Sequence, residues 1–79
     1  MDKEERLMEL LAVCRGLGAE VSYHPEYRHF TAMIWENREP AVSEAEARSI
    51  QQEIQQRAAQ YPGLVCYCFD PFSTLVYSV

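Results

Sequence analysis

Positive charge is scarce in this 79-residue chain. Lysine and arginine together number 7 against 12 aspartates and glutamates, which gives a formal net charge of −5. Because phosphate binding requires concentrated positive charge, we expect no direct contact with nucleic acid. The acidity suits a partner with a basic surface, although mild acidity also keeps a small protein in solution.

Long apolar runs are absent as well. No run approaches the ~20 residues of a membrane-spanning helix, and no basic segment leads into an apolar stretch as in a secretory signal peptide. The cysteines number 3, whereas a secreted disulfide scaffold usually carries an even set. These absences predict that the protein makes no membrane contact and works in the reducing cytoplasm.

The sequence motifs of common enzyme classes are missing. There is no glycine-rich phosphate loop and no G-x-S-x-G elbow. A nucleophilic Cys–His pair would have to combine Cys66 or Cys68 with a histidine, and no third group is evident to orient the pair. A chain of this length also has little room for a closed pocket. We therefore expect no enzymatic activity, no cofactor and no metal.

Two segments, residues 2–18 and 43–63, have the amphipathic pattern of a helix. Asp2 and Ser43 are their expected N-caps, each with a glutamate three residues later. Cys14 falls on the apolar stripe of the first helix and is interpreted as a core residue. The second helix has a glutamine-rich side that we interpret as solvated: Gln51, Gln52, Gln55 and Gln56.

Residues 19–35 predict a β-hairpin. If residues 25–28 form a four-residue loop, Tyr23 pairs with Phe30 and the apolar sides of both strands coincide, as a specified register requires. The other side then carries a second set of cross-strand pairs: His24 opposite His29, Ser22 opposite Thr31, and Glu20 opposite Met33, with Trp35 at the end.

Residues 64–79 predict a second hairpin, with a turn at Asp70-Pro71. Both of its faces are apolar, so the register is left open. The grouping with the cleanest segregation places six residues together: Val65, Tyr67, Phe69, Leu75, Tyr77 and Val79. The opposite face then includes Leu64, Cys66, Cys68 and Val76.

The element order is helix, strand, strand, helix, strand, strand, and we expect one domain over residues 1–79. Such elements predict an α+β fold: a two-layer αββαββ arrangement in which a four-stranded, mainly antiparallel sheet carries two helices on one face. The helical connection between the hairpins allows a parallel central pair formed by the second and third strands.

Cys66 and Cys68 stand one residue apart in the stretch VCYCF. On a strand their α-carbons would lie roughly 6.5–7 Å apart, at or beyond the usual range for a disulfide. Zinc knuckles and thioredoxin-like motifs place two residues between the cysteines, in a loop or at a helix N-terminus. We therefore interpret both residues as small apolar side chains of a strand.

His24 and His29 would lie close together on the sheet face that the helices leave open. They could share a metal or act as a pH-sensitive pair, but two ligands are few for a metal, and two surface histidines is the simpler interpretation. With Met33 and Trp35, and with the second hairpin's Leu64, Cys66, Cys68 and Val76, this face has the composition of a protein interface. The alternative is that the face assignment is reversed and these residues form core.

In size, acidity and two-layer α/β character, the whole chain resembles the small phage-encoded inhibitors known as anti-CRISPR proteins, which share no sequence motif. The resemblance implies a compact domain that docks on a basic surface of a nucleic-acid-handling complex, such as a CRISPR effector complex, in the cytoplasm of a bacterial host. Carboxylates can stand in for phosphates on such a surface. The acidic groups available are Asp2, Glu4, Glu5 and Glu9, and Glu36, Glu39, Glu44 and Glu46.

The predicted function is a small acidic protein-binding module that inhibits its partner by occlusion. The expected partner-binding residues are Glu36, Glu39, Glu44, Glu46, Glu20, Met33, Trp35, His24 and His29. Two alternatives stay open: a small-molecule sensor or carrier domain, and a homodimer formed through the open sheet face. A cavity lined by one of four tyrosines would favour the sensor: Tyr23, Tyr61, Tyr67 or Tyr77.

Overall fold

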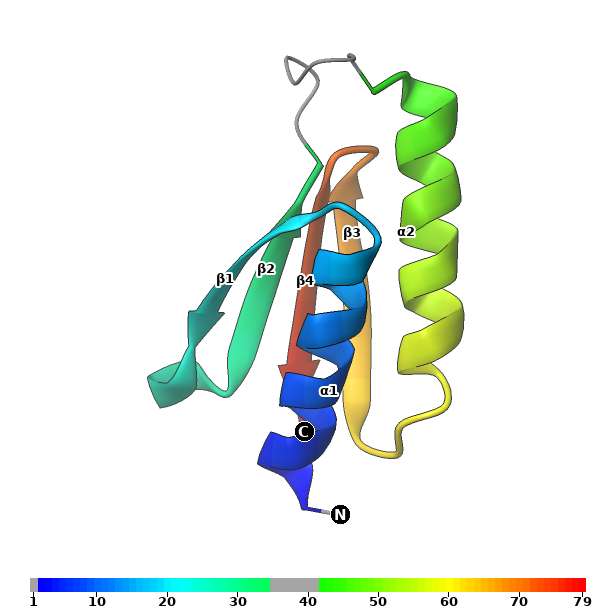
Figure 1. The fold of residues 1–79 in the computed structure, drawn as a ribbon. Helices are drawn as coiled ribbons and strands as arrows, with labels where there is room; N and C mark the ends of the chain where they lie inside the picture. Colours follow the sequence, from blue (N-terminus) through cyan, green and yellow to red (C-terminus); the bar gives the residue numbers. More distant parts are fainter. Residues whose placement is uncertain (1, 35–41) are drawn as a thin grey trace.

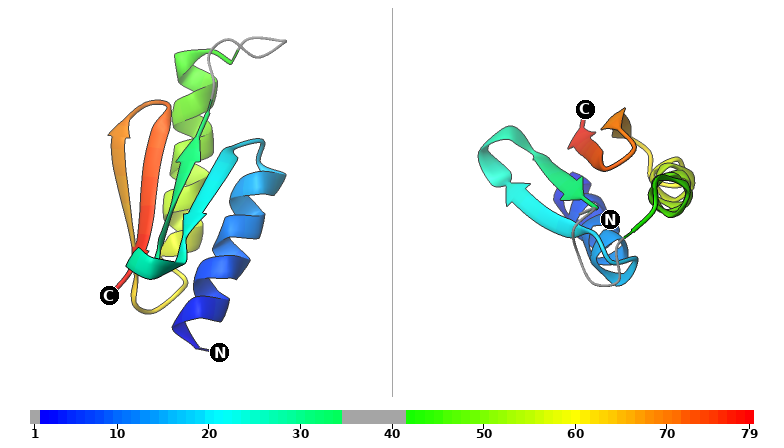
Figure 2. Two further views of the ribbon diagram at one scale, coloured as in Figure 1. Left: turned by 90° about the vertical axis from the view of Figure 1, so that its left-hand side faces the viewer. Right: turned by 90° about the horizontal axis from the view of Figure 1, so that it is seen from above.

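The computed structural model describes residues 2–34 and 42–79. Its elements follow the predicted αββαββ order, with one short 3-10 helix added in the first hairpin (Figure 1). Their bounds are α1 Lys3–Gly16, β1 Glu20–His24, η1 Pro25–Tyr27, β2 His29–Met33, α2 Glu44–Ala58, β3 Leu64–Asp70 and β4 Ser73–Ser78. The fold is the predicted α+β type, with the sheet in one layer and both helices on one of its faces (Figure 2).

The sheet is antiparallel throughout, and its strand order is β1-β2-β4-β3. The allowance for a parallel central pair was wrong, because β4 lies between β2 and β3. The helical connection through α2 returns β3 in the direction of β2, and β4 fills the position between them, so both of its pairings are antiparallel (Figure 1). Antiparallel pairing is slightly more stable per residue than parallel pairing.

The helix starts predicted from the sequence are confirmed. Asp2 Oδ1 accepts a hydrogen bond of 2.8 Å from the Glu5 amide, and Ser43 Oγ accepts one of 3.1 Å from the Glu46 amide. Each bond satisfies an amide that the first helical turn leaves without a partner. After α1 the chain turns at Gly18, whose φ of 94° lies in the left-handed region that favours glycine.

The first hairpin has the predicted register. Tyr23 pairs with Phe30, and His24 pairs with His29. The loop is closed by η1 and by Arg28, whose amide donates to the Pro25 carbonyl at 3.2 Å. This loop length aligns the apolar sides of β1 and β2, so that both face the helices.

The core lies between the sheet and the two helices. Its β2 and β4 residues alternate along each strand, so Phe30, Ala32, Thr74 and Val76 are buried. The helices contribute Leu7, Leu10, Leu11 and Cys14 from α1, and Ala47, Ile54 and Ala58 from α2. Within residues 2–34 and 42–79, no helix covers the opposite side of the same strands (Figure 2).

The second hairpin faces the other way from the sequence interpretation. Val76 is buried and pairs with both Phe30 and Cys66, so Cys66 lies on the helix side of the sheet. Leu64, Cys68 and Val76 share that side, and their assignment to the open face was wrong. Of the six residues grouped together, Val65, Tyr67, Leu75 and Tyr77 share one side as predicted, but that side is the open face. Phe69 lies at a register shift with its ring against Tyr67, and Val79 follows the end of β4.

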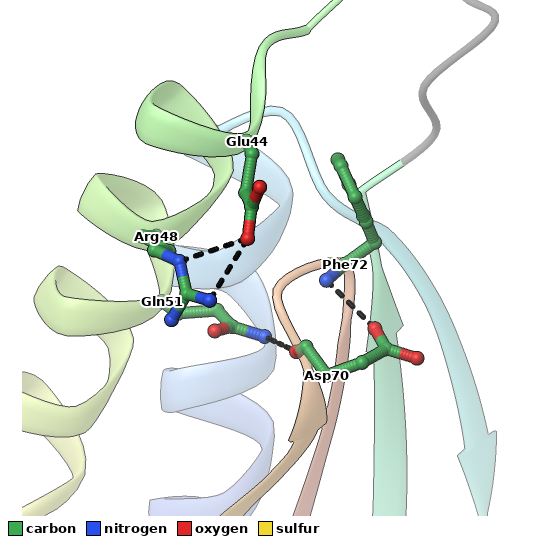
Figure 3. A network of polar contacts seen from close by, with 5 residues as sticks. All are labelled: Glu44, Arg48, Gln51, Asp70 and Phe72. Atoms are coloured by element: carbon green, nitrogen blue, oxygen red, sulfur yellow. Dashed lines mark hydrogen bonds and ion pairs between the residues drawn. The ribbon is translucent and has the colours of Figure 1, made fainter.

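The interpretation of the glutamine-rich side of α2 was wrong for Gln51, which is only 6% exposed. Its Nε2 atom lies within hydrogen-bonding distance of the Asp70 and Ser73 carbonyls and of Thr74 Oγ1. These contacts fasten α2 to the connection between β3 and β4 (Figure 3). A buried amide can occupy this position because its donor group is satisfied.

Candidate functional site

The candidate site is the sheet face that carries no helix, which we call the open face. The strand register arranges its side chains in three rows across the sheet, each in the order β1, β2, β4, β3. The rows are His24, His29, Tyr77 and Val65; Ser22, Thr31, Leu75 and Tyr67; and Glu20, Met33, Ser73 and Asp70. Neighbouring positions in a row lie about 4.5–5.5 Å apart, so the rows form a continuous surface.

Five aromatic rings cross the open face from one corner to the opposite one, and we call this set the aromatic diagonal: Tyr27, His29, Tyr77, Tyr67 and Phe69. Tyr27 stacks on His29, with ring centroids 5.5 Å apart and planes at 11°. Tyr77 pairs with His29 and lies diagonally from Tyr67. Tyr67 meets Phe69 edge to face at 5.1 Å.

The rings at both ends of the aromatic diagonal are strongly exposed. Tyr27 is 69% exposed, Tyr67 57% and Phe69 59%. A contiguous apolar and aromatic patch on a small protein marks an interaction surface more often than a surface that meets only water. Aromatic side chains are also enriched among the residues that dominate binding energies at interfaces.

The charge on the open face is acidic. Glu20 and Asp70 stand at the two ends of the third row, and no lysine or arginine occupies a position in the three rows of the described strands. Arg28 lies in the loop between Tyr27 and His29, next to the first row. The face therefore combines aromatic surface with negative charge, which complements a basic partner.

The two histidines lie together at one end of the open face, as predicted. Their ring centroids are 5.1 Å apart, and His24 Nδ1 lies 3.9 Å from Glu26 Oε1. Within residues 2–34 and 42–79, no three metal-ligating side chains are grouped so that they could hold an ion. The pair is part of the open face, where His29 stacks on Tyr27.

The other predicted partner-binding residues do not all share this face. Glu20 and Met33 lie on it, in the third row. Glu44 and Glu46 belong to the first turn of α2, in the helix layer, and Glu44 pairs with Arg48 at 2.8 Å. Trp35, Glu36 and Glu39 lie outside the described residues.

Sequence reasoning missed the part of the open face that the second hairpin contributes. Tyr67, Leu75 and Tyr77 are there in place of Cys66 and Cys68. The Asp70-Pro71 turn alone could not have revealed this, because the register shifts between Cys68 and Asp70, and a regular two-residue connection through Pro71 and Phe72 would pair Tyr67 with Val76 instead of Leu75. Asp70 Oδ1 accepts a 2.8 Å hydrogen bond from the Phe72 amide, which holds that turn (Figure 3).

The cysteines are on the helix side, and all three are free thiols. Burial raises the pKa of Cys14 to about 12. Burial, and then the neighbouring Cys68, raise the pKa of Cys66 to about 12 as well. Because the thiolate is the reactive form, these two residues are poor nucleophiles and poor metal ligands at neutral pH.

A separate cavity of about 500 Å³ lies between the first turn of α1 and the first hairpin. Tyr23, Arg28 and Ser78 line it together with residues of α1. Ser78 Oγ is buried and has no hydrogen-bond partner among the described residues. This cavity meets the condition that favours a small-molecule sensor, a cleft lined by Tyr23.

No protein-family model, curated protein or solved structure matches this chain. Among the residues that the structure describes, neither helix combines the length and the apolar character required to cross a bilayer. The open face and the cavity therefore provide the chemistry that indicates a function.

Proposed function

We propose that the protein is a binding module whose open face docks on a basic surface of another protein and occludes it. The observation that carries this proposal is the aromatic diagonal, an exposed aromatic surface with carboxylates at its edge and no cation in its three rows. A net charge of −5 extends the same electrostatic bias over the whole chain. Charge complementarity of this kind accelerates association and selects the partner.

The class of partner follows from where basic protein surfaces are common. Proteins that handle nucleic acid concentrate lysine and arginine where they contact phosphates. A small acidic protein bound there would exclude the nucleic acid, which is inhibition by occlusion. The proposed partner is accordingly a bacterial nucleic-acid-handling complex in the cytoplasm, the arrangement implied by the resemblance to anti-CRISPR proteins.

Charge reversal on the open face tests this proposal. The partner is first captured from a bacterial lysate and identified by mass spectrometry, and its dissociation constant for this protein is then measured at 50 and 300 mM salt. We expect Glu20→Lys to weaken binding roughly tenfold at the lower salt, because a like charge then faces a basic surface. We also expect higher salt to weaken binding of the original protein.

The matched control is Glu53→Lys, which adds the same charge on α2, where Glu53 pairs with Arg57 at 3.3 Å. Because Glu53 is in the helix layer, its reversal should change the affinity no more than about twofold. Equal losses from both variants would show that only net charge matters, and would contradict docking through the open face. Salt-insensitive binding would contradict the electrostatic part of the proposal.

The cavity beside Tyr23 supports a second candidate function, a small-molecule sensor or carrier. Its volume of about 500 Å³ lies within the range of ligand pockets. If it is a ligand site, a compound from a library of polar metabolites should raise the melting temperature by several degrees through binding to the folded state. Arg28→Ala should remove that shift, and a shift retained in this variant would place the ligand elsewhere.

A further inference from the structure

One corner of the open face combines aromatic rings with a carboxylate. Tyr67 and Phe69 are both more than half exposed, and their rings meet edge to face at 5.1 Å. The register of β3 against β4 shifts between Cys68 and Asp70, so Phe69 occupies a β-bulge. A bulge redirects a side chain out of the regular alternation, and here it leaves Phe69 packed against Tyr67.

Asp70 follows Phe69 in the chain and is held by two hydrogen bonds. Its Oδ1 atom accepts a 2.8 Å hydrogen bond from the Phe72 amide, and its main-chain carbonyl accepts a hydrogen bond from Gln51. Figure 3 shows the other carboxylate oxygen of Asp70 pointing away from the turn. The carboxylate is therefore fixed in place with one oxygen directed outward.

These groups match a guanidinium better than an ammonium. A guanidinium is planar, stacks on an aromatic face and presents paired N–H donors to a carboxylate, whereas an ammonium is a compact and strongly hydrated point charge. A cation over a tyrosine or phenylalanine ring is also attracted by the ring quadrupole. No cation occupies a position in the three rows of the described strands, so the corner has no competing partner there.

We propose that Tyr67, Phe69 and Asp70 form a receptor for an arginine side chain of the basic partner. This inference rests on the proposed function and specifies its chemistry: the partner contributes arginine, and the guanidinium stacks on the rings while it donates to the outward carboxylate oxygen of Asp70. Tyr77 extends the aromatic surface along the diagonal for the apolar part of the same segment. Lysine of equal charge is bound less tightly at this corner.

The experiment compares two peptides on the intact 79-residue protein. Both are acetylated and amidated 12-residue glycine–serine peptides with four cations, arginine in one and lysine in the other, and their dissociation constants are measured by titration at 50 mM salt. We expect the arginine peptide to bind about tenfold more tightly. Amide chemical shifts should change at Tyr67, Phe69 and Asp70.

Three variants and one control locate the preference. Tyr67→Leu keeps apolar surface but removes a ring, and it should reduce the arginine-to-lysine ratio of affinities to about one to two. Asp70→Asn keeps an acceptor for the Phe72 amide but removes the charge, so it should weaken the arginine peptide about fivefold without unfolding the turn. Tyr27→Leu removes the exposed ring at the opposite corner and should reduce the ratio less than Tyr67→Leu does. The control outside the open face is Met8→Ala on α1, which should leave the ratio unchanged.

Several outcomes would overturn the inference. Equal affinity for the two peptides would overturn the preference for arginine. It would not contradict the proposal of a basic partner, because that proposal depends on charge alone. Loss of the ratio in Tyr27→Leu and not in Tyr67→Leu would place arginine binding at the other corner. A dimer in sedimentation that Tyr67→Leu dissociates would show that a second copy, and not an arginine, covers these rings.

Discussion

Replacing Phe30 by alanine should lower the free energy of unfolding by about 3–5 kcal/mol. Phe30 is 0% exposed, and it is the largest of the fully buried side chains. It lies in β2 between Tyr23 and Val76, with the helix layer above it, so no neighbour is free to fill the space that its ring leaves. The cost therefore includes lost burial and a residual cavity.

A loss of this size is a large fraction of the stability of a small domain, which is typically about 5–15 kcal/mol. We expect Phe30→Ala to shift the urea midpoint strongly downward with little change in the slope of the transition. Circular dichroism at equilibrium measures both quantities. A destabilisation below about 1 kcal/mol would mean that the ring is not at the centre of the core.

The adjacent residue supplies the control, because successive residues of a strand point to opposite faces. Thr31 follows Phe30 and lies in the second row of the open face. Thr31→Ala should change the free energy of unfolding by no more than about 0.5–1 kcal/mol, as expected for cross-strand pairs on an exposed face. A larger loss at Thr31 than at Phe30 would reverse the assignment of the two faces.

The first hairpin could be predicted from the sequence because one constraint fixed it. A loop over residues 25–28 makes the apolar sides of both strands coincide, and a slip of one residue would send Phe30 to the solvent. The helix starts at Asp2 and Ser43 were predictable for a similar reason, since capping depends on residues only three positions apart. Local chemistry determines both features.

The orientation of the second hairpin could not be derived in this way. Its two faces are both apolar: Cys66 and Val76 on one, Tyr67 and Leu75 on the other. Alternation separates these groups but does not say which one is buried, since burial depends on the shape of the space beneath the helices. Val76 is fully buried and Cys66 packs against the core beneath the helices, whereas Tyr67 on the other side is 57% exposed.

The strand order and the role of Gln51 depend on contacts that are distant in sequence. The chain leaves β2, passes through α2 and enters the sheet again as β3, with space for β4 between the two strands. No local sequence pattern specifies this position of β3. Gln51 lies four residues after Ala47 and three before Ile54, so the helical period places it on the buried stripe of α2, and only its polar side chain favours solvent. Its burial is explained only by the carbonyls of Asp70 and Ser73, which lie across the interface between α2 and the sheet.

High pH should destabilise the fold through its buried thiols. The pKa values of Cys14 and Cys66 are raised to about 12, chiefly by burial, from an ordinary value of 9.0. Between pH 9 and 12 both groups keep their protons in the folded state and lose them in the unfolded state. Because the unfolded state then binds fewer protons, the free energy of unfolding decreases as the pH rises through this window.

The expected loss between pH 8 and pH 10 is roughly 1 kcal/mol for Cys14, and less for the half-buried Cys66 because solvent screens its charge. Urea unfolding at a series of pH values under reducing conditions measures it. The double variant Cys14→Ala, Cys66→Ala removes both titrating groups, so its stability should be lower at pH 8 yet change much less between pH 8 and pH 10. If the double variant retains the full alkaline loss, these thiols are not its cause, and neither Cys14 nor Cys66 is as enclosed as its packing in the core cluster requires.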